Sequence, residues 1–104
     1  MTADVESARR DWEDGYRRLI AATSDAAGSD RLHAQVDAIV AELRKRVGAT
    51  FTLAQLAAAY ASSEAWLRET IDERASVPDW PRTVTLAGDA AFHLYARGAV
   101  DYAP

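Results

Sequence analysis

The stretch that decides the fold runs from residue 52 to residue 74 and reads TLAQLAAAYASSEAWLRETIDER. It opens with Thr52 and, three residues later, Gln55, which is the capping-box pattern of a helix N-terminus. Alanine-rich sequence favours continuation of that helix to about Ala61. A serine then stands where it can cap a second helix that begins at about Glu64. The sequence therefore predicts two short helices joined by a tight turn.

Two short helices joined in this way form a helix-turn-helix arrangement. Residues 50–54 and 83–87 each show a brief alternation of polar and apolar residues, and the two segments match closely. Alternation of this kind is typical of short strands, so we expect the two segments to pair as a small ribbon. With that ribbon, residues 30–86 resemble a winged helix. The resemblance implies a mainly α fold with at most two short strands.

The segment before this region predicts two long helices. Residues 3–23 place apolar side chains on one stripe at helical spacing. A second stripe of the same kind follows a short loop and continues to Val47, where Gly48 supplies a stop signal. Because the loop between them is short, we expect the two helices to pack against each other as an antiparallel hairpin over residues 3–47.

The length of 104 residues predicts a single domain, residues 1–104. Its second half, residues 50–97, contains the helix-turn-helix-like segment and a C-terminal helix from about Leu86 to Arg97. Between them lies a proline-rich segment that we expect to form a turn. Residues 98–104 form a tail.

Composition and charge exclude several classes of function. The chain has no cysteine, which excludes disulfides, thiolate metal ligands and cysteine nucleophiles. Its net charge of −4 disfavours sequence-independent binding of nucleic acid. No stretch approaches the roughly 20 apolar residues of a spanning helix, and the acidic N-terminus is unlike a signal peptide. We therefore expect a cytoplasmic protein without membrane contact.

Two histidines each have an aspartate four residues away in the sequence. His33 precedes Asp37, and His93 follows Asp89. Such pairs can serve acid–base chemistry or half of a metal site, but no further ligand follows at a useful spacing. Nothing in the sequence resembles a nucleophile elbow or a glycine-rich phosphate loop. We therefore predict no catalytic residue, no metal and no cofactor.

Several side chains are candidates for contact with a partner. Helical geometry places Trp66 on the acidic side of its helix, away from Leu67, so its replacement by alanine is expected to leave stability nearly intact. The last helix is apolar on most sides, which is typical of a helix buried in a core or at an interface. The predicted partner-binding residues are Trp66, Glu69, Thr70, Glu73, Trp80, Phe92 and Tyr95.

Three functions remain open from the sequence. The first is a non-enzymatic protein-interaction or regulatory module that binds a partner protein or a second copy of itself. The second is a helix-turn-helix-type DNA-binding transcriptional regulator, although the four carboxylates of residues 64–74 would face phosphates. The third is a small helical ligand-binding protein or enzyme built around His93 and Asp89.

Overall fold

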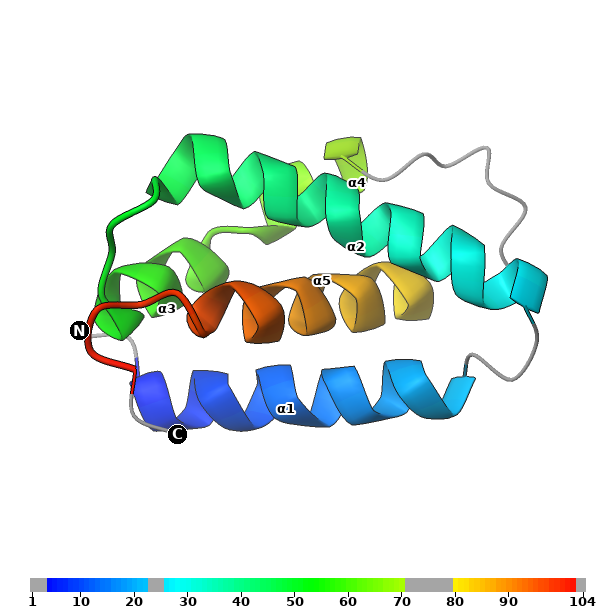
Figure 1. Cartoon of the computed structure of the whole chain (residues 1–104), viewed down its shortest axis with the longest axis horizontal. Helices are drawn as coiled ribbons and strands as arrows, with labels where there is room; N and C mark the ends of the chain where they lie inside the picture. Colours follow the sequence, from blue (N-terminus) through cyan, green and yellow to red (C-terminus); the bar gives the residue numbers. More distant parts are fainter. Residues whose placement is uncertain (1–3, 23–25, 71–79, 103–104) are drawn as a thin grey trace.

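The computed structural model describes residues 4–22, 26–70 and 80–102, and all regular structure within these residues is helical (Figure 1). The mainly α fold is therefore confirmed. The described helices are α1 (Val5–Ala22), α2 (Ala26–Val47), α3 (Leu53–Ala61), α4 (Glu64–Thr70) and α5 (Trp80–Ala96).

Helix α5 forms the centre of the domain and packs against all four other described helices. Figure 1 shows it lying between α1 and α2, which run in opposite directions on either side of it. The expected direct packing of the two long N-terminal helices is therefore replaced by packing of each against α5. An apolar helix gains more from burial than an amphipathic one, so the most apolar of the three long helices takes the central position.

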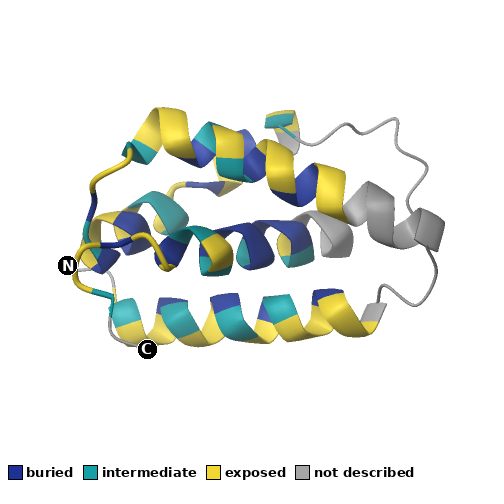
Figure 2. Cartoon of the chain, in the orientation of Figure 1, coloured by how far each residue is buried: buried dark blue, intermediate teal, exposed yellow. Residues whose placement is uncertain are grey.

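The core is built from aromatic and aliphatic side chains around the alanine-rich face of α5. Trp12 of α1 stacks on Phe92 of α5 with ring centroids 5.7 Å apart, and Tyr60 of α3 contacts Trp12 edge-on at 5.6 Å. Such aromatic pairs add to the stabilisation from buried area alone. Figure 2 shows that the buried residues of the described helices face this shared interior. The largest fully buried side chains are Trp12, Phe92, Ile39, Leu43 and Leu56.

Gly15 allows α1 to approach α5 closely. A Cβ atom at this position would lie 2.3 Å from the Cβ of Asp89, which is far closer than nonbonded carbon atoms can come. Glycine in the middle of a helix costs about 1 kcal/mol relative to alanine. The close packing of the two helices at Asp89 explains why glycine stands here.

The resemblance to a winged helix with at most two short strands is not confirmed. Residues 83–87 lie inside α5, and residues 53 and 54 form the first turn of α3, so the described residues contain no ribbon and no wing. Five residues of alternation are too few to distinguish a strand from part of a buried helix. Pro81 was expected to lie in a turn before a helix that starts at about Leu86. It lies instead in the first turn of α5, which begins at Trp80, and its missing N–H is not needed there.

Two signals at helix ends were predicted correctly. Gly48 adopts a positive φ of 92° after the last residue of α2, as a helix-ending glycine does. Thr52 and Gln55 form both hydrogen bonds of the capping box at the start of α3. The sequence also indicated Ser29 or Asp30 as the cap of the second helix, but α2 begins earlier, at Ala26.

The described part of the tail is attached to the start of α3. The Val100 N–H donates to the Phe51 carbonyl at 2.9 Å, and the Leu53 N–H donates to the Asp101 carboxylate at 2.8 Å. Both bonds satisfy backbone groups near a helix end that otherwise lack a partner. The tail therefore fixes the end of α5 to the start of α3.

Candidate functional site

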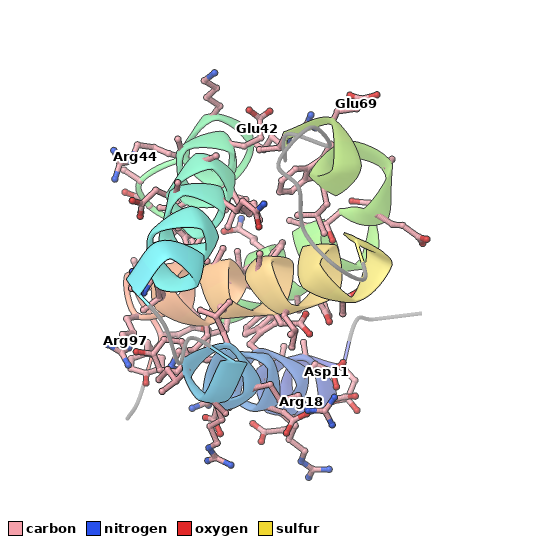
Figure 3. The ribbon with its side chains drawn as sticks, turned by 90° about the vertical axis from the view of Figure 1, so that its right-hand side faces the viewer. Asp11, Arg18, Glu42, Arg44, Glu69 and Arg97 are labelled. Carbon is pink, nitrogen blue, oxygen red and sulfur yellow. The ribbon has the colours of Figure 1, made fainter. Side chains whose placement is uncertain are left out.

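An open groove of about 550 Å³ lies between α2, α3 and α4, and is called the α4 groove below. Its walls combine small side chains with one tryptophan and two residues of opposite charge. Figure 3 shows that Glu42 of α2 and Glu69 of α4 lie at the same end of the molecule, above α5. The lining residues are Arg46, Ala59, Ser62, Ala65, Trp66 and Glu69.

Trp66 forms the floor of the α4 groove. Its side chain packs toward Phe92, with ring centroids 6.4 Å apart, and is 6% exposed. The Arg46 guanidinium lies over the ring at 4.8 Å from its centroid, within cation–π range. Glu42 holds that guanidinium through a 2.9 Å hydrogen bond from Arg46 Nε. The expected position of Trp66 away from the core is therefore wrong, because Phe92 of α5 and Arg46 of α2 both cover this side of α4.

The other predicted partner-binding residues fall in three places. Glu69 is exposed beside Trp66, and the Thr70 hydroxyl donates to the Trp66 carbonyl at 3.0 Å. Phe92 has no exposed surface and belongs to the core. Tyr95 lies on another side of α5, where its hydroxyl donates to the Gly48 carbonyl. Glu73 and the Trp80 side chain lie outside the described residues.

A polar pair that sequence reasoning missed joins α3 to the middle of α5. The Tyr60 hydroxyl donates to Asp89 Oδ1 at 2.7 Å. Burial raises the pKa of Asp89 to about 6, against the lowering effect of the Tyr60 hydrogen bond, and Asp11 and Asp14 of α1 raise it further. Burial and the Asp89 carboxylate also raise the pKa of Tyr60. The two residues are 29 positions apart, so no local pattern indicated the pair.

His93 takes part in contacts other than the expected pairing with Asp89. Its ring stacks on Tyr16 with centroids 4.7 Å apart, and its Nε2 lies 3.3 Å from the Arg97 guanidinium. Burial, with Arg97 nearby, lowers the pKa of His93, which favours the neutral ring. His33 lies exposed on α2. Across the described ranges, no three metal-ligating side chains lie close enough to hold a metal ion.

A second groove, of about 350 Å³, lies between the C-terminal ends of α2 and α5 and is called the α5 groove below. Leu94 is 37% exposed at this groove. Tyr95 stacks on Phe51 there, with ring centroids 4.8 Å apart. The lining residues are Val40, Arg44, Ala49, Phe51, Leu94, Tyr95 and Gly98.

Comparison with known proteins provides no family for this chain. No protein family, no curated protein and no solved structure matches it. In the part of the chain that the structure describes, no helix is long and apolar enough to span a membrane. The two grooves and the Tyr60–Asp89 pair are therefore the features from which a function can be inferred.

Proposed function

We propose that this chain is a non-enzymatic protein-interaction module with a regulatory role, and that it binds a partner protein through the α4 groove. The observation that supports this function is the seating of Trp66 beneath Arg46 at the floor of an open groove. Tryptophan and arginine are the residues that most often dominate the energy of protein interfaces.

The rest of the α4 groove favours the same function. Ala59, Ser62 and Ala65 have short side chains, so the backbone of a partner helix can approach closely. Arg46 and Glu69 carry opposite charges beside them, so a partner helix with complementary charges would bind in one orientation. Contacts with Phe92 and the ion pair with Glu42 hold Trp66 and Arg46 in place, so a partner loses little entropy in ordering them.

A DNA-binding role is less favoured, although α3 and α4 do follow one another across a tight turn. The exposed side of α4 carries Glu64 and Glu69. Carboxylates in these positions would lie near phosphates if α4 entered a major groove, and would be repelled. An enzymatic role is less favoured because Asp89 and His93 engage different partners, Tyr60 and Tyr16.

Substitutions at two exposed alanines test the proposed function. Ala65→Arg places a long charged side chain in the α4 groove, whereas Ala58→Arg places the same side chain on α3 outside the groove. Both variants should unfold at temperatures close to that of the wild type, because neither alanine is buried. The measurement is quantitative affinity capture from the cells of origin, with nuclease added.

The proposed function predicts that one or a few proteins bind the wild type and Ala58→Arg but not Ala65→Arg. The same proteins captured equally by all three chains would refute a role for the α4 groove. Loss of all partners on nuclease treatment would instead support the DNA-binding alternative.

A further inference from the structure

The α5 groove is a second concave surface, and it lies on a different side of α2 from the α4 groove. Arg44 and Arg46 mark the two sides, because Arg44 lines the α5 groove and Arg46 lines the α4 groove. The floor of the α5 groove is apolar, with Leu94 exposed between Val40 and Phe51. The exposed part of Leu94 gives this floor an apolar contact surface beside the stacked rings of Tyr95 and Phe51.

The α5 groove is also already ordered. The Tyr95 hydroxyl donates to the Gly48 carbonyl at the end of α2, and the Tyr95 ring stacks on Phe51. Phe51 in turn accepts a backbone hydrogen bond from Val100. These contacts fix both walls before any ligand arrives, which lowers the entropic cost of binding.

Two arginines lie on the side of the molecule that carries the α5 groove. Figure 3 shows Arg44 of α2 and Arg97 at the end of α5 projecting on the same side. Both are exposed, and within the described residues no carboxylate lies at ion-pair distance from either guanidinium. Among the described polar side chains, the Arg97 guanidinium contacts only the His93 ring. The lowered pKa of His93 favours the neutral form of that ring. The nearest acid along the same face of α2, Asp37, is two turns from Arg44, a rise of about 10 Å.

We propose that the α5 groove binds an acidic segment of a partner protein that carries one bulky apolar side chain. The apolar side chain packs on Leu94, Val40 and Phe51, and flanking carboxylates pair with Arg44 and Arg97. A volume of about 350 Å³ is at the lower end of ligand pockets, which suits one or two side chains. This site is additional to the α4 groove, so the chain would connect two partner segments.

Other occupants fit the α5 groove less well. A two-fold dimer across it would bring the same surface of both copies together, so four guanidinium groups, from Arg44 and Arg97 of each copy, would share one interface. Nucleic acid would satisfy the two guanidinium groups but would leave the apolar floor around Leu94 unused. The net charge of −4 also opposes phosphates over the rest of the surface.

Selection from a phage-displayed library of random short peptides tests this inference on the full chain. Enriched peptides should share a large apolar residue flanked by two or more Asp or Glu residues. For the best peptide, Arg44→Glu with Arg97→Glu should weaken binding by roughly tenfold or more, and added salt should weaken binding to the wild type. The double variant Arg44→Gln with Arg97→Gln repeats the test if the glutamates destabilise the end of α2.

Matched variants distinguish the two grooves. Leu94→Lys should weaken the peptide, whereas Ala65→Arg in the α4 groove should leave its affinity unchanged, which also separates this inference from the proposed function. Enriched peptides without acidic residues, or binding that survives both arginine replacements, would refute the inference. Equal competition by duplex DNA would assign the surface to nucleic acid, and self-association lost in the double variant would assign it to a second copy.

Discussion

The hydroxyl of Tyr60 donates a 2.7 Å hydrogen bond to Asp89 and so connects α3 to the middle of the central helix. Asp89 is partly buried where Gly15 brings α1 against α5. A carboxylate in this position is stabilised by its donor and destabilised by loss of solvent and by the nearby Asp11 and Asp14. Because these effects oppose one another, substitutions at Tyr60, Asp89 or Gly15 should change the free energy of unfolding.

The first prediction concerns pH. The pKa of Asp89 is about 6 in the folded protein, above its ordinary value of 3.8, so the folded state binds more protons than the unfolded state between these values. The contribution of Asp89 to the free energy of unfolding therefore falls as pH rises from about 4 to about 6, and then stays constant. Partial exposure reduces the loss to about 1–2 kcal/mol.

Urea unfolding of the wild type and of Asp89→Asn across this pH range measures the effect. The asparagine does not titrate, so the variant should gain stability relative to the wild type as pH rises toward 6. A constant difference between the two proteins from pH 4 to pH 7 would contradict the raised pKa of Asp89.

The second prediction concerns the hydrogen bond itself. Tyr60→Phe keeps the ring contacts with Trp12 and Phe92 but removes the donor to Asp89. At neutral pH the loss should be about 1–3 kcal/mol, because it leaves a partly buried carboxylate without its donor. The loss should be smaller at low pH, where Asp89 is protonated. Urea unfolding at both pH values measures it, and an equal loss at both would mean that the hydroxyl acts independently of the Asp89 charge.

The third prediction concerns Gly15. Helix propensity alone predicts that Gly15→Ala stabilises α1 by about 1 kcal/mol. The new Cβ would collide with the Asp89 Cβ, so α1 would have to move away from α5. This contact predicts that Gly15→Ala destabilises the protein. We expect a lower melting temperature for Gly15→Ala, and a smaller decrease when the same substitution is made in Asp89→Gly, which lacks the opposing Cβ. A higher melting temperature for the single variant would show that the helices can separate at little cost.

The fourth prediction concerns the floor of the α4 groove. Trp66 is almost fully buried, so Trp66→Ala should cost about 3–5 kcal/mol of stability. Arg46→Ala removes only the guanidinium over the ring and the ion pair with Glu42, and should cost about 1 kcal/mol or less. Denaturant unfolding of both variants measures these losses of stability. A small loss for Trp66→Ala would show that Trp66 is exposed, as the sequence indicated.

Sequence patterns predicted the features that depend on neighbouring residues. The capping box at Thr52, the stop at Gly48 and the apolar stripe of α1 each depend on residues a few positions apart. Contacts between distant residues could not be predicted in this way. The burial of Trp66 and the Tyr60–Asp89 hydrogen bond both depend on how α3 and α4 pack on α5, and periodicity gives no information on that packing.

One sequence signal could have located the polar pair. Gly15 stands in the middle of an otherwise well-patterned amphipathic helix, where glycine is unfavourable. A glycine there indicates close approach of another backbone, and the structure places Asp89 of α5 opposite it. The strand prediction for residues 83–87 failed because a five-residue alternation also fits part of a helix, and these residues lie inside α5.

Site-specific photocrosslinking in living cells tests the proposed partner site most directly. The photoreactive residue p-benzoylphenylalanine would replace Ala65 in the α4 groove in one chain and Ala58 outside it in another. The proposed function predicts one or a few discrete protein adducts from position 65 that are missing from position 58. The same adducts from both positions, or adducts that contain only nucleic acid, would contradict it.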